Sequence, residues 1–183
     1  TALGGLTTGK RNVGIGVGTA GSNALTGDNN VLLGYHAGKS ATGTSGSVYI
    51  GHNAGQNHTM GYANVAIGSG SMGLANQTFG GENIAIGSYT LEDTTEGAFN
   101  IAVGFRAADE LTTGNYNIAL GHLAMSAGTT TGIQNIAIGR LALKDVTGAN
   151  NNIGIGFRAL RDTANTATRN IGIGHEVAFD GVL

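Results

Sequence analysis

The sequence contains no cysteine, no proline and no tryptophan, and it is poor in charged residues. A chain without cysteine forms no disulfides in any compartment, so the absence of cysteine does not indicate whether the protein works in a reducing or an oxidising environment. Only 11% of its 183 residues are charged, against about 25% in ordinary domains. The few basic residues are scattered and the net charge is −2, so we expect no nucleic-acid partner. No apolar run approaches the roughly 18 residues of a membrane span, and we expect no membrane insertion.

Glycine is abundant, at 34 of 183 residues, well over twice the usual share of about 7%. Apolar residues make up 40% of the chain, and isoleucines recur at fixed places. Disordered chains have few β-branched residues and a high net charge. The composition therefore predicts an ordered, solenoid-like chain.

One five-residue unit recurs every 17 to 19 residues along the chain. It consists of Asn, a β-branched residue, a small residue, Ile or a relative, and Gly. Its ten copies begin at Asn12, Asn30, Ser47, Asn64, Asn83, Asn100, Asn117, Asn135, Asn152 and Asn170. Two variable residues follow each Gly, then an apolar pair and a turn-rich stretch. A short, regular period of this kind is typical of solenoids, and we predict an all-β parallel β-solenoid of about ten coils.

Both ends of the sequence fall inside a repeat. Ala2-Leu3 followed by Thr7-Thr8-Gly9 matches the later part of the unit, and the last residues follow soon after Ala178. Neither end looks like the capping repeats that solenoids need. We therefore expect residues 1–183 to be a single repeat segment of a longer fibre.

Alternation along each strand predicts two distinct faces. In Ile84-Ala85-Ile86 the two isoleucines share one face, which we expect to form the core. The opposite face is mostly Ala or Gly, and we expect a neighbouring backbone to approach it, from the same coil or from a second chain. Leu32 and Tyr49 depart from this pattern and predict looser crowding near the N-terminal end. The apolar pair after the Gly predicts a second short strand.

The leading Asn permits two interpretations. Asn side chains stacked along a solenoid can form a hydrogen-bonded ladder, or each Asn can simply supply a turn before its strand. The Gly that ends the unit predicts a backbone conformation that a Cβ would block. We expect the extra residues of the longer repeats to lie in surface turns.

The two residues after each Gly vary within an otherwise strict repeat, which predicts an outward-facing column. Its aromatic rings offer stacking faces and its arginines offer charge, a mixture that suits a host glycan or an outer-surface protein. Ordinary solvated side chains would give the same pattern. The candidate receptor-binding residues are Tyr35, His36, His52, Phe105, Arg106, His122, Arg140, Phe157, Arg158 and His175.

We predict no catalytic site, no cofactor and no metal centre. The segment Gly16–Gly21 matches a dinucleotide fingerprint, but no helix follows it to bind a pyrophosphate. His52, His122 and His175 lie on distant coils and could meet only their own copies across a trimer axis. The carboxylates lie in or beside turns, outside the kind of cleft that general acid–base chemistry needs.

The unit Asn-x-Ala-Ile-Gly-x-x-Ala-Leu, followed by Thr-Thr-Gly and Asn, resembles a repeat of bacteriophage tail fibres. It also resembles the head of trimeric autotransporter adhesins, the YadA-like head. This likeness extends from Ala2 to about Ala178. It implies a left-handed parallel β-roll, a homotrimer that is intertwined or side by side, and attachment to a host.

The period of 17 to 19 residues and the absence of Ser after the Asn favour the phage-fibre version. We therefore expect a rigid virion tail-fibre spacer that can also present a host-attachment surface. The head of an adhesin on a bacterial cell surface is the alternative. A catalytic or ice-binding solenoid is the third hypothesis. The sequence disfavours the hexapeptide acyltransferase type, because Glu92 and Lys144 occupy positions that its six-residue apolar period needs. The threonines lie in turns, which disfavours an ice-binding array.

Overall fold

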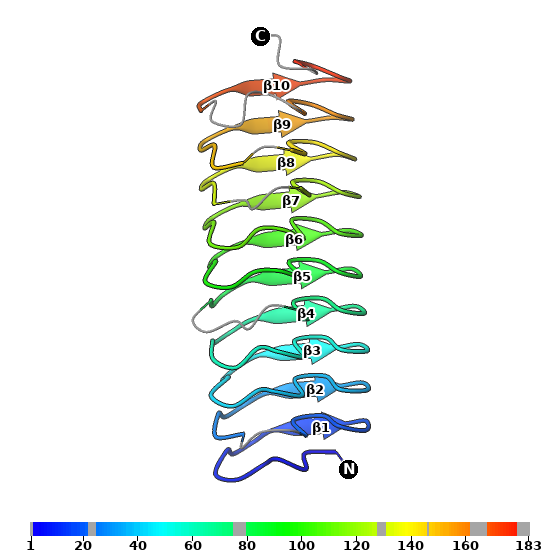
Figure 1. The fold of residues 1–183 in the computed structure, drawn as a ribbon, viewed down its shortest axis with the longest axis vertical. Helices are drawn as coiled ribbons and strands as arrows, with labels where there is room; N and C mark the ends of the chain where they lie inside the picture. The colour runs from blue at the N-terminus through cyan, green and yellow to red at the C-terminus, as the bar shows by residue number, and fades with distance from the viewer. Residues whose placement is uncertain are drawn as a thin grey trace.

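The computed structural model describes residues 2–21, 25–74, 80–127, 131–145, 147–161 and 168–178. Each repeat forms one coil, and the coils stack along one axis into a straight rod (Figure 1). The ten strands are β1 (Val13–Ile15), β2 (Val31–Leu33), β3 (Val48–Ile50), β4 (Val65–Ile67), β5 (Ile84–Ile86), β6 (Ile101–Val103), β7 (Ile118–Leu120), β8 (Ile136–Ile138), β9 (Ile153–Ile155) and β10 (Ile171–Ile173). At about 4.8 Å per strand, ten coils rise roughly 50 Å. The described residues include no helix long and apolar enough to cross a membrane.

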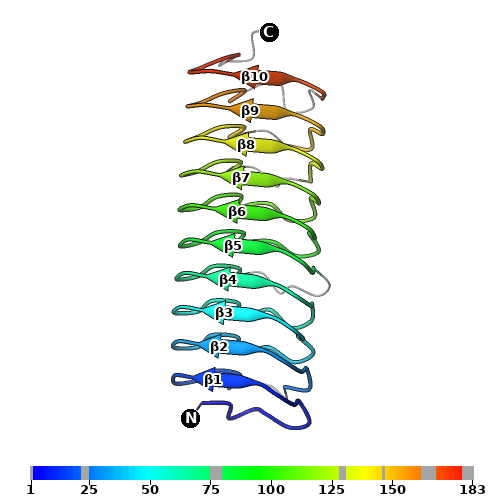
Figure 2. The ribbon, with the colours of Figure 1, turned by 180° about the vertical axis from the view of Figure 1, so that it is seen from behind.

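The strands form one parallel sheet in sequence order, because each coil adds its strand beside the previous one (Figure 2). The register keeps equivalent positions together, so that Ile84 pairs with Ile101 and Ala85 pairs with Ala102. A position of the repeat therefore becomes a column of side chains along the rod. The predicted all-β parallel β-solenoid with a period of about 17 residues is confirmed.

The two faces of the sheet are the reverse of our prediction. Ala85 and Ala102, in the middle of their strands, point into the coil and are fully buried. Ile84 and Ile86 point outward and are 36% and 38% exposed. The reason is the thinness of the coil: in most coils the returning turn packs directly against the strand and leaves room for only a small side chain. The expectation that the isoleucines form the core was wrong. The small-residue face is approached by the backbone of its own coil, which was one of the two alternatives: a Cβ added at Gly154 would lie 3.0 Å from the carbonyl oxygen of Ala159.

In the β2, β3 and β5 coils, core volume is shared between the middle residue of the strand and the turn residue six positions later. Ala85 is followed by Leu91, whereas Tyr49 and Leu32 are each followed by a glycine. A Cβ added at Gly55 would lie 2.6 Å from the ring of Tyr49, so the ring occupies that space. The predicted looser crowding near the N-terminal end was therefore wrong, because a large residue on one side is matched by glycine on the other.

The return side of each coil is a run of tight turns and not the predicted second strand. Ala107 and Ala108 are buried, but Arg106 and Ala108 have φ of 51° and 50°, far from the extended values of a strand. The N–H of Ala107 donates to the carbonyl of Gly104 at 3.4 Å, within the coil. The N–H of Ala108 donates to the carbonyl of Ala124 on the next coil at 2.9 Å. Hydrogen bonds thus connect the coils on this side as well.

The glycine that ends each strand has the conformation that the repeat predicted. Gly51 and Gly87 both have φ of +135°. A Cβ added to them would lie 2.6 Å and 2.5 Å from the carbonyl oxygen of the equivalent glycine on the next coil. Both the backbone angle and the space exclude an L side chain. Each of the four repeats longer than 17 residues contains one of the segments 22–24, 75–79, 128–130 and 162–167, so our prediction for their extra residues lies outside the described residues.

The leading asparagines form the ladder, one of the two interpretations. The N–H and Nδ2 of Asn83 donate to Oδ1 of Asn64 at 3.0 and 3.1 Å, and Nδ2 also donates to the carbonyl of Gly97 at 2.8 Å. Oδ1 of Asn83 accepts from the N–H and Nδ2 of Asn100 at 2.9 and 3.1 Å. Each of these buried side chains thereby satisfies its polar atoms within the stack.

The ladder changes at Ser47, where a different buried network replaces the amide. Oγ of Ser47 accepts from the N–H of Asn64 at 3.2 Å. The Tyr49 hydroxyl lies 2.6 Å from Nδ1 of His58, and Nδ2 of Asn64 lies 3.3 Å from Nε2 of the same ring. Oδ1 of Asn64 accepts from the N–H of Asn83, so its Nδ2 must donate to Nε2. In the neutral imidazole, Nδ1 therefore carries the proton and donates to Tyr49, whose pKa is raised by burial.

Candidate functional site

The outward side of the sheet exposes two columns of apolar side chains along the rod, which we call the aliphatic face. One column comprises Val13, Val31, Val48, Val65, Ile84, Ile101, Ile118, Ile136, Ile153 and Ile171, and the other Ile15, Leu33, Ile50, Ile67, Ile86, Val103, Leu120, Ile138, Ile155 and Ile173. Ten of these side chains are 36% to 68% exposed, and the others are partly exposed. Large contiguous apolar patches are rare on monomers and mark interaction sites.

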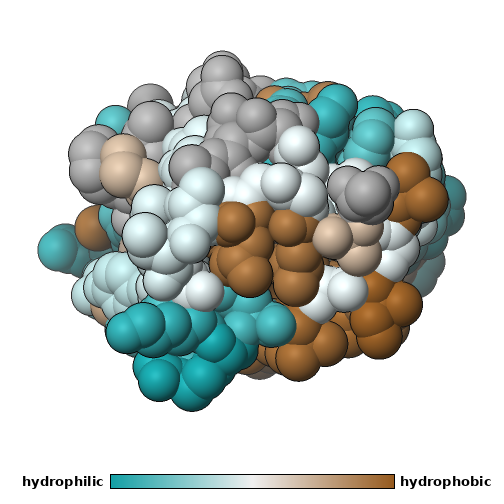
Figure 3. Space-filling view, turned by 90° about the horizontal axis from the view of Figure 1, so that it is seen from below, coloured by the Kyte–Doolittle hydropathy of each residue, from teal (hydrophilic) through white to brown (hydrophobic). Residues whose placement is uncertain are grey.

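The aliphatic face is large enough for a protein interface. Ten coils at about 4.8 Å and five extended residues at about 3.3 Å give a plane of roughly 800 Å². Stable complexes bury about 800 Å² per partner. Seen from the N-terminal end, hydrophobic surface reaches the flank of the rod beside a hydrophilic cluster at one corner (Figure 3).

One border of the aliphatic face is the column of residues directly after each strand-ending glycine, which we call the glycine-side edge. It comprises Val17, Tyr35, His52, Ser69, Ser88, Phe105, His122, Arg140, Phe157 and His175, all exposed or partly exposed. Rings on adjacent coils stack, since the coil spacing matches ring contact. Ring centroids are 5.4 Å apart for Tyr35 and His52, with planes 8° apart, and 5.4 Å for Phe105 and His122, at 19°.

The stacking determines which groups of the glycine-side edge a ligand can contact. The guanidinium carbons of Arg140 and Arg158 lie 5.6 and 4.8 Å from the ring centre of Phe157, and His175 lies 5.0 Å from the same ring. These ring faces are turned along the rod toward neighbouring side chains, and fewer are free to stack on a sugar than we expected. The edge instead presents ring rims, imidazole nitrogens and guanidinium groups.

The second residue after each glycine lies close to the backbone, with a positive φ. The charges of Arg106 and Arg158 are compensated, because Arg106 lies 3.3 Å from Asp109 and Arg158 lies 2.8 Å from Glu176. The ring of His36 lies 3.8 Å from that of Tyr35. Desolvation, then Lys39 and His52, lower the pKa of His36 and favour its neutral form.

By their ring and cation contacts, the ten candidate receptor-binding residues fall into three groups along the rod, of which the second and third lie on adjacent coils. The first is Tyr35, His36 and His52, the second is Phe105, Arg106 and His122, and the third is Arg140, Phe157, Arg158 and His175. Ser69 and Ser88 interrupt the column between the first two groups. Sequence reasoning missed Tyr89, whose ring meets Phe105 edge to face at 6.2 Å.

The opposite border of the aliphatic face is the column directly before each leading Asn or Ser, which we call the asparagine-side edge. It comprises Arg11, Asn29, Gly46, Ala63, Glu82, Phe99, Tyr116, Gln134, Asn151 and Arg169, all exposed and all with positive φ. Phe99 and Tyr116 stack with ring centroids 4.9 Å apart and planes 4° apart. Sequence reasoning missed this pair, although two aromatic residues at one repeat position on adjacent coils were the available signal.

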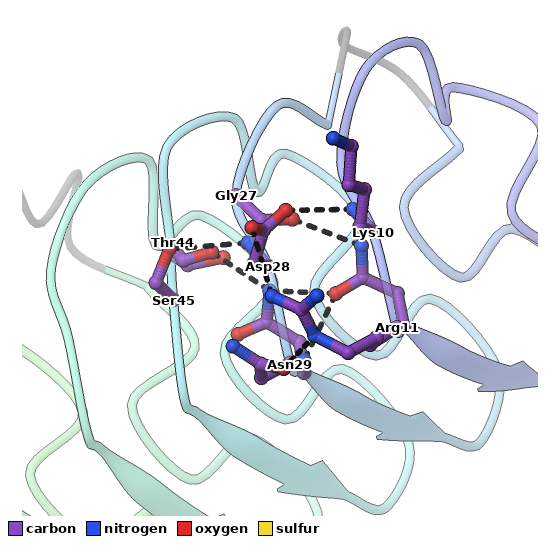
Figure 4. A network of polar contacts seen from close by, with 9 residues as sticks. Lys10, Arg11, Gly27, Asp28, Asn29, Thr44 and Ser45 are labelled. Atoms are coloured by element: carbon purple, nitrogen blue, oxygen red, sulfur yellow. Dashed lines mark hydrogen bonds and ion pairs between the residues drawn. The ribbon is translucent and has the colours of Figure 1, made fainter.

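The asparagine-side edge begins as a polar network near the N-terminal end (Figure 4). Nε of Arg11 donates to Oδ1 of Asn29 at 2.6 Å, and the N–H of Lys10 donates to Oδ1 of Asp28 at 2.6 Å. The N–H of Asp28 donates in turn to Oγ of Ser45 at 3.1 Å. The edge is therefore polar near the N-terminal end, aromatic at Phe99 and Tyr116, and polar again at Gln134, Asn151 and Arg169.

Carboxylates are concentrated on the turn side of the coils that carry β5 and β6. Glu92 and Asp109 occupy equivalent positions on these coils and are nearly buried. Burial, and then the Asp93 carboxylate, raise the pKa of Glu92, while Arg106 acts in the opposite direction. Burial is also the largest cause that raises the pKa of Asp109.

The described part of the chain shows no pocket and no group of three or more His, Asp or Glu side chains placed to hold a metal ion. The three equivalent histidines lie on separate coils, as expected. Comparisons with protein-family models, with curated proteins and with solved structures give no match to this chain.

Proposed function

We propose that this chain is a rigid segment of a homotrimeric bacteriophage tail fibre, a spacer that also carries a host-attachment surface. The observation that carries the proposal is the aliphatic face, two uninterrupted apolar columns that follow the rod over ten coils. A single chain would leave this surface in water, which is unfavourable in proportion to its apolar area. Further copies of the same chain offer an equally long, equally flat and uncharged surface to cover it.

Closed rotational symmetry is the usual way in which identical chains cover such a surface. In the proposed trimer, three rods lie parallel with their aliphatic faces toward a common axis. A second chain was one of the two neighbours that we expected at the Ala and Gly positions, but these lie inside each coil. The aliphatic face takes their place in the proposal, and the result is a fibre with an apolar centre along its length.

The attachment role is assigned to the glycine-side edge. Imidazole and guanidinium groups there can donate hydrogen bonds to a host glycan or an outer-surface protein. Phe105, Phe157 and Tyr35 contribute mainly by holding these groups in a stacked column. The proposal assigns no catalysis and no cofactor to the chain, and it locates the chain in the virion. The head of a bacterial trimeric adhesin is the alternative.

Sedimentation of the purified chain tests the trimer. We expect a single trimeric species that the variant I101K/V103K converts to monomers with unchanged β-type circular dichroism. Charged side chains are costly in an apolar interface but are solvated on the surface of a monomer. Lysine at exposed Thr113, on the turn side of the same coil, is the matched control and should leave the trimer intact. A monomeric wild-type chain at micromolar concentration would overturn the proposal.

Antibodies against the chain separate the two locations. Under the fibre hypothesis they label the tail fibres of intact phage particles in electron micrographs. Under the adhesin hypothesis they label the envelope of intact bacterial cells. Binding of the trimer to host cells, lost in R140A/H175A but not in a turn-side control such as T113A, would support attachment through the glycine-side edge.

A further inference from the structure

The aromatic pairs on the two borders of the aliphatic face lie on the same two coils. Phe99 and Tyr116 stack on the asparagine-side edge of the β6 and β7 coils. Phe105 and His122 stack on the glycine-side edge of those coils. Between the pairs lies the aliphatic face of β6 and β7. At this level the apolar surface is therefore wider than elsewhere along the rod.

The asparagine-side pair is held at a conformational cost. Phe99 and Tyr116 have φ of 59° and 60°, a region that Gly or Asn adopts far more cheaply than a bulky aromatic residue. Both rings are also exposed, at 39% and 56%. Within one chain the two rings stack on each other, but their outward surfaces stay in contact with water. A contact with a second molecule would bury the outward surfaces of both rings.

Symmetry determines what such a contact can be. Rotation about an axis parallel to the rod keeps every coil at its own level and places the glycine-side edge of one copy beside the asparagine-side edge of the next. Phe99 of one copy then meets Phe105 of its neighbour, and Tyr116 meets His122.

We propose that the Phe99–Tyr116 pair of each protomer packs against the Phe105–His122 pair of the next, and that this contact sets the axial register of a parallel trimer. The aliphatic columns alone define register weakly, because every coil presents nearly the same side chains and a shift by one coil costs little. A shift by one coil leaves only one of the two ring contacts. A shift by three or four coils would place the Phe99–Tyr116 pair beside Phe157 and His175 or beside Tyr35 and His52, but it would uncover three or four coils of the aliphatic face. An antiparallel pair centred on these coils would also bring aromatics together, but it would leave the face of β1 and β2 uncovered.

This inference rests on the proposed trimer, and it reduces the number of candidate residues that remain available for host attachment. Phe105 and His122 become contact residues between protomers. The remaining candidates lie on coils where the neighbouring edge carries small or polar residues, Asn29 and Gly46 beside the first group and Gln134 and Asn151 beside the third. Host contact is thereby assigned to the groups around Tyr35 and around Arg140.

Cysteine cross-linking tests the register, and the absence of native cysteine makes it clean. With a short bismaleimide, F99C/F105C should give covalent trimers in high yield. A63C/F105C is the matched control, with both cysteines on the same two edges but two coils apart, about 10 Å along the rod. Its yield should be at least tenfold lower. F99C/Y116C should react only within one chain.

The outcomes separate this inference from the proposed trimer. Two outcomes would overturn the register: preferential reaction of A63C/F105C, or covalent dimers from F99C/Y116C without product from F99C/F105C. In either case the proposed function would stand if sedimentation still showed trimers. A monomer in sedimentation overturns both. If a double variant does not fold, the separately prepared single variants F99C and F105C can be mixed before assembly. Each chain then carries one cysteine, so the expected product is a covalent dimer that joins one chain of each variant.

Discussion

The β3 coil and the β5 coil follow the same path with different interiors. The β3 coil has Ser47, Tyr49, Gly55 and Gln56 where the β5 coil has Asn83, Ala85, Leu91 and Glu92. In the β5 coil an amide ladder and a leucine fill the interior. In the β3 coil a tyrosine crosses it and reaches His58. The difference shows that the fold depends on the sum of the interior volumes and on satisfied polar atoms, and not on any single residue of the repeat.

The largest loss of stability should come from the glycine that both coils share. Gly51→Ala and Gly87→Ala each place a Cβ against a backbone carbonyl and force an L residue to φ of +135°. We expect more than about 3 kcal/mol in each case, since neither backbone can move without shifting the next coil. Urea unfolding followed by circular dichroism measures the loss. A clearly smaller effect in one coil would mean that the two paths are not equivalent.

Exchange of the interior residues should show that volume is shared. Tyr49→Ala is expected to cost about 3 to 5 kcal/mol, as other large-to-small core substitutions do, and it removes the hydroxyl partner of His58. Gly55→Leu alone overpacks the coil against the Tyr49 ring and costs about 1 to 3 kcal/mol.

The double variant Y49A/G55L copies the Ala85 and Leu91 arrangement and should recover part of the loss. Its free energy of unfolding should exceed the value obtained by adding the two single effects. Strict additivity would show that the two positions do not share one space.

Because of the ladder, removing the side chain of Asn83 should lower the free energy of unfolding more than removing that of Ser47. Asn83→Ala leaves the carbonyl of Gly97 and the N–H of Asn100 without their side-chain partners, at about 1 to 3 kcal/mol for each buried group. Ser47→Ala removes the acceptor of the Asn64 N–H and the hydrogen bond to the Tyr49 side chain, which is fewer partners than Asn83 has, and should cost about 1 to 2 kcal/mol. The two free energies of unfolding, measured in the same buffer, check the ranking. Equal losses would contradict a cooperative ladder.

The smallest effect should come from the turn side and should depend on pH. The pKa of Glu92 is raised in the folded protein, so the folded state binds this proton more tightly than the unfolded chain. Wild-type stability therefore falls as the pH rises from the ordinary carboxyl range through the raised pKa. Glu92→Gln copies Gln56 of the β3 coil and removes the penalty.

We expect this variant to gain about 1 kcal/mol or less at neutral pH, and the gain should vanish in acid, where wild-type Glu92 is protonated. Unfolding curves over a pH series measure it. Gln56→Glu is the reciprocal control and should be neutral or stabilising at neutral pH, because Lys39 occupies the equivalent position on the coil before it. A gain from Glu92→Gln that grows toward acid would contradict the assigned direction.

Much of the fold could be predicted from the repeat. The ten units predicted ten stacked coils, since an element that recurs at a nearly constant interval can bury its faces by stacking. The glycine after each strand was predicted for the same reason, because its position never varies. The ladder was one of two interpretations, and only the distances between adjacent Asn side chains distinguish them. The three groups within the candidate site depended on which coils are neighbours, although their members were all predicted.

The sequence by itself determined the period, the parallel order of the strands and the columns in which the side chains stand, because these follow from repetition and from strand alternation. Only the tertiary structure decided which side of each strand faces inward. Alternation separates Ile84 from Ala85 but does not say which of them is enclosed, and hydrophobicity alone favours the wrong one. The deciding quantity is the narrow space between strand and turn, which admits Ala85 beside Leu91 and leaves the isoleucines outside as the surface on which the proposed assembly depends.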